Sequence, residues 1–499
     1  MEHRDSLRRA PLAMDAATFR ALGHRLVDQL AQSLDAMPRG PVTRDESPSA
    51  VREPLNLSGP LPESGMEAGP LLEQTARFLF EHSLFNGHPR FFGYITAPPA
   101  PIGMFGDFLA AAVNANIGAW TLAPAATEIE SQTVRWIATL IGYPSACGGL
   151  LVSGGNMANF VCFLAARTAS AGSDVRARGI AGDSPRLRVY ASAETHTWIQ
   201  KATDLAGLGT DAIRWIPTDE RLRMDVAALR RHIEQDKAAG DVPCIVVGTA
   251  GSVSTGAVDP LPAISTVCLE HGVWFHVDGA YGGFAAAVPE SPDDLRGLSD
   301  ADSVAVDPHK WLYAPLEAGC ALVRDPEKLR AAFAYHPPYY HFDEQALNYV
   351  DYGPQNSRGF RALKVWLALK HVGAAGYREM IAGDIALART MAEAVGRCDD
   401  LELATQDLSI TTFRYVPRDL RANIGVETAE RHLDALNREL LDRLQRGGEV
   451  FVSNAVVRGR FLLRACIVNF HTTRTDVEAA VQVVRRVGQQ VDAGMREPS

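Results

Sequence analysis

The chain has 499 residues, 46% of them hydrophobic, which is enough to bury a large core and form two or three domains. Its net charge of −10 argues against nucleic-acid or anionic-membrane partners, because these require a concentrated basic surface. We expect no membrane span and no secretory signal, since no uninterrupted apolar stretch has the required length. The seven cysteines are scattered and form no CxxC pair, so we expect a reducing, cytoplasmic compartment.

A short tail is expected over residues 1–14, followed by an N-terminal segment over residues 15–90. Apolar residues at helical spacing in "DAATFRALGHRLVDQLAQSLDAM" predict a helix, with Asp15 as its N-cap. A Pro/Gly-rich stretch over residues 38–70 then interrupts the pattern. A helix followed by an extended segment has little core of its own. We therefore expect this segment to pack on another domain or on a second subunit, which favours a dimer.

Short β-branched runs alternate with helical stretches from about residue 149 to residue 325, inside a large domain expected over residues 91–372. The predicted strands are "GLLVS", "RLRVYAS", "AIRWIPT", "PCIVVGT", "VWFHVD", "SVAVD" and "GCALVRD". Amphipathic helices such as "DVAALRRHIEQDKAAG" separate several of them. The pattern predicts an α/β fold with a mainly parallel sheet and helices on both faces. Ligands of such sheets bind beyond the carboxyl ends of the strands.

A different pattern starts at about residue 373. It is rich in helical stretches and contains two strand-like pieces, "LSITTFRYV" and "RFLLRACIVNF". This predicts a small C-terminal α+β domain over residues 373–499.

Several sequence motifs do not indicate their usual function here, because they are incomplete or lie in the wrong structural context. "GLGTDA", at residues 207–212, fits the loose dinucleotide-binding pattern but precedes a predicted strand where it should follow one. The sequence has no GxxxxGK[ST], HExxH or GxSxG, so a nucleotide P-loop, a zincin and an α/β-hydrolase lose their usual evidence. "HPPYYHFDE" offers four potential metal ligands without a supporting context, and we predict no metal site. These ligands are His336, His341, Asp343 and Glu344.

A glycine turn follows the first predicted strand, in "GLLVSGGNMANF". It opens a helix, and the free N–H groups and positive dipole end of a helix attract anions. Gly154, Gly155 and Asn156 could therefore hold a phosphate. The alternative is an ordinary strand-to-helix turn.

Three titratable residues follow other predicted strands. His196 precedes a helix, a position that is more often structural than catalytic. Asp278 ends a strand so apolar that a carboxylate needs a cation or good hydrogen bonds there, unless it caps a turn. Lys310 follows "SVAVDPH", where a lysine is more often a solvated surface residue.

Taken together, these features match the requirements of pyridoxal phosphate. A lysine forms a Schiff base with the cofactor aldehyde, an aspartate keeps the pyridine nitrogen protonated, and a helix N-terminus holds the phosphate. A histidine such as His196 can lie against the ring. Each signal is weak alone, but their joint occurrence in one α/β region predicts a pyridoxal-phosphate site.

On these residues the chain resembles the group II pyridoxal-phosphate-dependent decarboxylases, and within them aromatic-L-amino-acid decarboxylase. Over about residues 15–490 it has, in the family's order, "HPRFFGYI", "APAATEIE", "SGGNMAN", "THTWIQKA", "HVDGAYGG", "DPHKW", "FRALKVW" and "CIVNFHTT". The resemblance implies fold type I and a homodimer with active sites at the subunit interface, embraced by the N-terminal segments. It also implies that an L-amino acid, with aromatic ones leading, is converted to its amine and CO2.

The resemblance further implies roles for individual residues. Lys310 would bond the cofactor aldehyde, Asp278 would pair with the ring nitrogen, and His196 would stack on the ring. Gly155 and Asn156 would contact the phosphate. The implied cofactor-binding set is Lys310, Asp278, Ala280, His196, Gly155, Asn156 and Ser252.

Two more residues would act near the substrate. His309 would help to order the catalytic loop beside the substrate, and Tyr339 would be the loop tyrosine that protonates the substrate carbon. Tyr340 is a competing choice for that tyrosine. The implied catalytic set is Lys310, His196, Tyr339 and His309.

The sequence also departs from the family. Asp307 stands where asparagine is common, and an acid near a phosphate is repulsive unless it points away or bonds the backbone. "TAGSVSTG" leaves Ser252 and Ser254 as alternative cofactor contacts, and Asn86 replaces an expected tryptophan. Acidic or small amino acids therefore stay open as substrates. An aminotransferase, an aldehyde synthase and a non-catalytic pyridoxal-phosphate-binding protein are the remaining alternatives.

Overall fold

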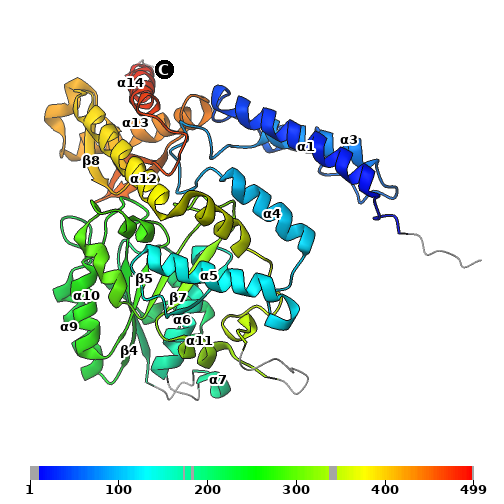
Figure 1. Cartoon of the computed structure of the whole chain (residues 1–499). Helices are drawn as coiled ribbons and strands as arrows, with labels where there is room; N and C mark the ends of the chain where they lie inside the picture. The colour runs from blue at the N-terminus through cyan, green and yellow to red at the C-terminus, as the bar shows by residue number, and fades with distance from the viewer. Residues whose placement is uncertain (1–9, 172–174, 181–184, 337–345, 497–499) are drawn as a thin grey trace, which may run out of the picture.

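The computed structural model describes residues 10–171, 175–180, 185–336 and 346–496. A large domain with a seven-stranded sheet carries a smaller domain with a four-stranded sheet, and a helical arm projects from the body (Figure 1). None of the helices in these ranges is long and apolar enough to cross a membrane.

The large sheet contains all seven predicted strands. They are β1 (Gly148–Val152), β2 (Leu187–Ser192), β3 (Ile213–Ile216), β4 (Val242–Thr249), β5 (Trp274–Asp278), β6 (Ser303–Val306) and β7 (Gly319–Val323). Their order is β1-β7-β6-β5-β4-β2-β3. Only β7 runs antiparallel to its neighbours in this sheet, so the prediction of a mainly parallel sheet is confirmed.

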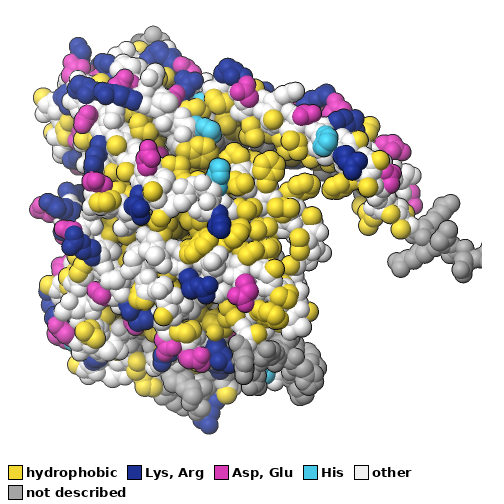
Figure 2. Space-filling view, in the orientation of Figure 1, with side chains coloured by type: hydrophobic (Ala, Val, Ile, Leu, Met, Phe, Trp, Pro, Cys, Tyr) yellow, Lys and Arg dark blue, Asp and Glu magenta, His cyan; other side chains and the backbone are white. Residues whose placement is uncertain are grey.

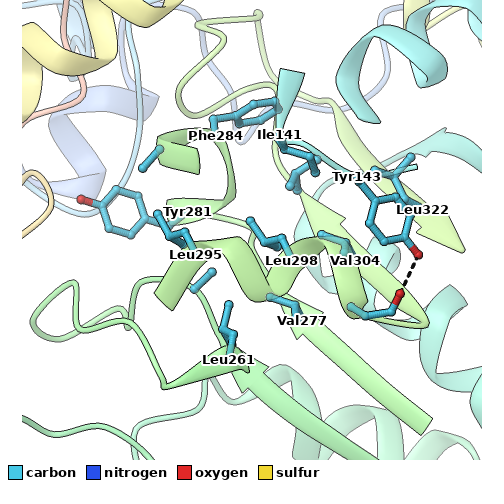
Figure 3. Close-up of a cluster of buried hydrophobic side chains, with 14 of the residues drawn as sticks. Ile141, Tyr143, Leu261, Val277, Tyr281, Phe284, Leu295, Leu298, Val304 and Leu322 are labelled. Carbon is cyan, nitrogen blue, oxygen red and sulfur yellow. Dashed lines mark hydrogen bonds between the residues drawn. The ribbon is translucent and has the colours of Figure 1, made fainter. Parts of the chain in front are cut away.

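Apolar residues alternate between the two faces of this sheet, as the pleat requires. On β6, Val304 and Val306 join the core beneath α5 (Pro124–Leu140) and α10 (Leu261–His271). Ala305, between them, joins the core beneath α6 (Gly155–Ala171) on the opposite face. Figure 3 shows part of the first core, where Tyr143 donates a hydrogen bond to the carbonyl of Ala301. Helices therefore cover both faces, as predicted.

Shorter helices complete the large domain. They are α7 (Val175–Arg178), α8 (Trp198–Leu205), α9 (Val226–Ala238) and α11 (Pro326–Phe333). The 3-10 helices of the described chain are Met37–Arg39, Trp120–Leu122, Thr210–Ala212, Gly282–Ala287, Asp293–Asp300, Tyr349–Asp351 and Arg418–Asn423. The "GLGTDA" stretch lies between α8 and β3, which is not the position of a dinucleotide-binding turn.

The small domain is built on an antiparallel sheet of order β10-β11-β9-β8. Its strands are β8 (Leu401–Asp407), β9 (Ile410–Tyr415), β10 (Ser453–Val457) and β11 (Arg460–Cys466). The helices α13 (Glu427–Arg446) and α14 (Arg474–Arg496) pack on it. The long helix α12 (Ala362–Gly396) enters this domain across a kink at Gly373, where φ is +71°. The predicted pieces contain β9 and β11, whereas β8 and β10 were missed.

The arm contains α1 (Ala16–Ala36), α2 (Pro48–Arg52) and α3 (Ala68–His82), and α4 (Pro101–Val113) follows it. Asp15 caps α1 as predicted, because its carboxylate accepts the backbone N–H groups of Ala17 and Thr18 at 2.9 Å. No residue of α1 is buried. Hydrophobic side chains gather along the arm and the neighbouring body (Figure 2). The exposed ones on α1, α3 and α4 include Phe19, Val27, Leu71, Leu72, Leu79, Phe105, Phe108, Leu109 and Val113.

Candidate active site

A cavity of about 400 Å³ lies at the carboxyl ends of β4, β5 and β6, beside the start of α6. This is where an α/β sheet places its ligands. The structure brings most of the predicted site residues to its wall. These are Lys310, Asp278, Ala280, His196, Gly155, Asn156 and His309.

The glycine turn forms one wall of the cavity. Gly154 has a φ of +93°, a left-handed conformation that favours glycine. A Cβ atom on Gly155 would lie 2.7 Å from Asp307 Oδ2 and 3.1 Å from the Cβ of Ala280, so no side chain fits there. Gly154, Gly155 and Asn156 line the cavity at the start of the 17-residue helix α6, where the first N–H groups have no partner within the helix. This backbone can hold a phosphate.

Asp278 ends β5 with its carboxylate buried and hydrogen-bonded. The indole Nε1 of Trp198 donates to Oδ2 at 2.7 Å, and the backbone N–H of Ala280 donates to Oδ1 at 3.1 Å. The sequence predicted that an acid here needs a cation or good hydrogen bonds, and hydrogen bonds are what it has. Trp198 lies within "THTWIQKA" but was not identified as a partner. The sequence feature that could have indicated this partner is an indole N–H donor two residues after His196.

His276 supports Asp278 from the same face of β5. Its Nε2 lies 2.7 Å from Asn159 Oδ1, and its Nδ1 lies 2.8 Å from Ser303 Oγ. Its ring meets the Trp198 ring edge-on at 5.7 Å between centroids. Burial lowers the pKa of His276 to about 4, against an opposing effect of Asp278. The imidazole is therefore neutral at pH 7 and links Asn159 and Ser303 through hydrogen bonds.

Lys310 lies on the floor of the cavity with 17% of its side chain exposed. Its Nζ is 3.0 Å from Asp307 Oδ2. The other carboxylate oxygen of Asp307, Oδ1, is buried and has no hydrogen-bond partner in the described chain. Asp307 thus lies between the lysine and the glycine turn, and the solvated-surface alternative for Lys310 does not hold.

His309 lies beside this pair and is held by the backbone. Its Nδ1 donates to the carbonyl of Ala318 at 2.7 Å, which leaves Nε2 as an acceptor 3.7 Å from Asp307 Oδ2. Burial lowers the pKa of His309, while Asp307 opposes that effect. The ring is therefore neutral near pH 7.

His196 lines the cavity, and its side chain is exposed in the single chain. Its Nδ1 accepts the backbone N–H of Trp198 at 3.2 Å, which fixes the ring at the start of α8. Partial burial lowers the pKa of His196, and the charge of Asp278 opposes this shift. A mostly neutral, oriented ring is suited to stacking on a flat cofactor.

Some predicted residues are not brought to the cavity. The hydroxyl of Ser252 lies 3.0 Å from Thr255 Oγ1, and its neighbours Gly251 and Val253 line the cavity instead. Cofactor contact by Ser252 or Ser254 therefore stays a prediction.

Tyr339 and Tyr340 lie outside the described residues, as do His341, Asp343 and Glu344 of the disfavoured metal alternative. His336 is described, and its Nε2 lies 2.9 Å from Asp351 Oδ1.

The fold and this geometry are those of a fold type I pyridoxal-phosphate enzyme. Residues 56–416 match the family model described as the pyridoxal-dependent decarboxylase conserved domain, and the chain belongs to this family. Within it, the chain is of the group II, aromatic-L-amino-acid decarboxylase-like kind.

Curated relatives match over nearly the whole chain. An aromatic-L-amino-acid decarboxylase of Bacillus atrophaeus is 31% identical over 485 residues, covering 96% of this chain and 97% of that protein. A phenylacetaldehyde synthase of Petunia hybrida is 31% identical over 483 residues, covering 95% and 94%. Among solved structures, the crystal structure of Oryza sativa TDC with PLP and tryptamine superimposes with a TM-score of 0.88. Its sequence is 29% identical, and the match covers 97% of this chain and 99% of that chain. The protein is thus a decarboxylase enzyme that uses pyridoxal phosphate.

Proposed function

We propose that the protein decarboxylates an aromatic L-amino acid to the corresponding amine and CO2. Similarity to decarboxylases whose names specify aromatic substrates, over 96% of the chain in the case of the Bacillus enzyme, supports the substrate class. The observation that carries the proposal is the wall of the cavity. Val253 and Leu316 line it together with Lys310, so an apolar side chain can lie close to the lysine.

In this proposal the chain's own residues hold the cofactor at three points. Lys310 would bond its aldehyde, Asp278 would pair with its ring nitrogen, and the backbone at Gly155 and Asn156 would bind its phosphate. The bound cofactor supplies an electron sink for the electron pair released when the carboxylate leaves as CO2. The hydrogen bond from Trp198 orients the Asp278 carboxylate, which would face the ring nitrogen of the bound cofactor.

The remaining groups orient the substrate and move the proton. His196 would stack on the cofactor ring, and Ala280 would pack against the cofactor. His309 presents an unprotonated Nε2 toward the cavity, where it can accept a hydrogen bond from the substrate. Tyr339 would donate the proton to the substrate carbon.

We also propose that the enzyme is a homodimer whose active sites lie at the subunit interface. Its arm supports this, because contiguous exposed apolar surface on a helix marks an interaction site. The rings of Phe19 and Phe108 stack with 6.5 Å between their centroids, yet each residue remains 56% exposed. A second copy of the chain would cover them.

An aldehyde synthase is the second candidate, because the Petunia relative carries that name. Both activities release CO2, but only a decarboxylase leaves the amine intact. An acidic substrate is the other alternative.

The deciding experiment incubates the pyridoxal-phosphate-loaded enzyme with a panel of aromatic, acidic and small aliphatic L-amino acids, and measures CO2, amine and aldehyde. We expect CO2 and amine in equal amounts from at least one aromatic amino acid. Aldehyde in place of amine would favour the synthase, and release from acidic substrates alone would replace the aromatic proposal. Absence of CO2 from every substrate would refute decarboxylation.

A further inference from the structure

The residues that follow Lys310 are tied to one buried carboxylate on α12. The indole Nε1 of Trp311 and the hydroxyl of Tyr313 both donate to Asp384 Oδ2, at 3.0 Å and 2.7 Å. Asp384 is 3% exposed, and both aromatic side chains are more deeply buried. One oxygen atom therefore accepts hydrogen bonds from two side chains of the loop that carries the lysine.

The loop that carries Asp278 joins the same junction. Tyr281 stacks on Trp311 at 4.8 Å between ring centroids. Its hydroxyl points away from the large-domain core (Figure 3) and lies 2.7 Å from Ser409 Oγ, next to β9 of the small domain. The two loops that would hold the cofactor thus meet at Trp311.

The small domain completes the junction from the other side. The backbone N–H of Asn469 lies 3.4 Å from Asp384 Oδ1, and its side-chain amide donates to the carbonyl of His88 at 2.9 Å. Phe470 meets the Tyr313 ring edge-on at 5.2 Å. Asp384 therefore joins the lysine loop to the small domain and, through Asn469, to the chain that leads from the arm.

We propose that Asp384 is a positioning residue, whose carboxylate locks the Trp311–Tyr313 segment against the small domain and thereby fixes Lys310 in the geometry that retains the cofactor. The proposal rests on the proposed function in that Lys310 is the lysine that bonds the cofactor. Asp384 itself does not line the cavity.

The carboxyl group of Asp384 changes its charge near neutral pH. Burial raises the pKa of Asp384 to about 7, although the hydrogen bonds from Tyr313 and Trp311 oppose this shift. As the pH rises through that value, the carboxylate becomes charged. Hydrogen bonds to a charged acceptor are roughly twice as strong as neutral ones. The hydrogen bonds from Trp311 and Tyr313 to Asp384 should therefore strengthen at higher pH.

Other titratable groups around Asp384 do not change charge in this range. They are Tyr313 on the lysine loop, Cys466 on β11, and Tyr377 on α12, whose hydroxyl donates to the Leu312 carbonyl at 3.1 Å. Burial raises the pKa of each of these three groups above its ordinary value, which keeps them neutral near pH 7. The loop also carries His309, whose pKa burial lowers below its ordinary value of 6.5. A step near pH 7 that disappears in Asp384→Asn can therefore be assigned to Asp384.

The test compares the loaded wild-type enzyme with Asp384→Asn between pH 6 and pH 8.5. It measures the rate of cofactor release into excess apo-acceptor protein, and hydrogen exchange of the peptide that contains Lys310. In the wild type, release should slow and protection should rise through a step near pH 7. Asp384→Asn should lose the step and release the cofactor at least about fivefold faster at pH 8, a change that corresponds to roughly 1 kcal/mol.

Tyr377→Phe is the matched control, because it removes a buried hydrogen bond to the same loop without touching Asp384. It should keep the step. If Asp384→Asn retains the wild-type step and release rate, or if Tyr377→Phe also loses the step, the proposal is overturned.

Tyr313→Phe provides a test that does not depend on folding of the Asp384 variant. Loss of a hydrogen bond that lowers the pKa of Asp384 should move the step to higher pH. An unmoved step would contradict the proposal. Because cofactor release and exchange are measured without substrate, these outcomes are separate from the CO2 panel that tests the proposed function.

Discussion

In the arm, α1 buries no side chain and α3 buries only Ala76, whereas Trp311 and Tyr313 behind Lys310 are almost inaccessible to solvent. The two regions also differ in their polar contacts. Every hydroxyl and indole N–H named in the junction has a partner, while the arm presents apolar side chains to water. The groups that would hold the cofactor are thus supported within one chain, whereas the arm presents exposed apolar surface of the kind that marks interaction sites.

The largest effect is expected at the cofactor lysine. Lys310→Ala should reduce decarboxylation below detection. It should also lower the thermal unfolding temperature of the apoprotein, because it leaves the buried carboxylate of Asp307 without its cation. CO2 release and calorimetry measure the two quantities. Lys237→Ala, on the exposed surface of α9, is the control and should be fully active. Substantial turnover by Lys310→Ala would remove the lysine from the mechanism.

A smaller effect is expected at the ring-nitrogen partner. Asp278→Asn keeps the size of the side chain and an oxygen that accepts from Trp198, so the protein should fold. It loses the negative charge that maintains a protonated ring, and kcat should fall on the order of 10²-fold. Steady-state kinetics at saturating cofactor separate this loss from weaker binding. Wild-type kcat in this variant would exclude the assigned role.

The arm provides the third prediction. Leu79 on α3 is 52% exposed in the single chain, and Leu79→Asp should weaken self-association at least tenfold, because burying an unpaired carboxylate costs more than about 1.4 kcal/mol. Analytical ultracentrifugation measures the dimer dissociation constant. Gln74→Asp adds the same charge to the same helix at a position that is already polar, and should have less effect. A wild-type chain that sediments as a monomer would contradict the dimer proposal.

The buried, neutral His276 predicts that the folded protein loses stability in acid. Because the pKa of His276 is lowered to about 4 in the folded protein, the unfolded chain binds an additional proton below its ordinary value of 6.5. The free energy of unfolding should therefore fall as the pH decreases from about 6.5 towards 4. Urea denaturation of the wild type and His276→Gln at pH 7 and pH 5 measures this difference. An equal pH dependence in both proteins would argue against a neutral, buried His276.

The smallest effect is expected at Ser252. Its hydroxyl bonds Thr255, and a hydrogen bond of this kind contributes about 1 kcal/mol net. Ser252→Ala should lower the free energy of unfolding by about that amount and leave cofactor affinity within about threefold of the wild type. A much larger loss of cofactor affinity would support the sequence-based prediction that Ser252 contacts the cofactor.

Much of the fold could be predicted because buried strands are short apolar runs separated by helical patterns. The order of the strands could not, since nothing in "GCALVRD" indicates that β7 lies antiparallel between β1 and β6. The edge strand β8, "LELATQD", was missed because most of its side chains are at least partly exposed and it has no apolar run.

The candidate site followed from chemistry-bearing residues placed directly after strands, and the family resemblance assigned their roles. Residues that act through another side chain were missed. Asp384 comes three residues after the buried Ile381 and precedes the buried Ile385, so an acid on the apolar stripe of a helix was its only signal. Its partners Trp311 and Tyr313 lie more than 70 residues earlier in the sequence, and only the folded chain shows that they meet.

The most direct test of the central claim locates the cofactor on the chain. The loaded enzyme is reduced with borohydride, digested and mapped by mass spectrometry. The account predicts a stable pyridoxyl-phosphate adduct on Lys310 and on no other lysine, and its absence in Lys310→Ala. An adduct on a different lysine, or persistence of the same labelled peptide in that variant, would contradict the account.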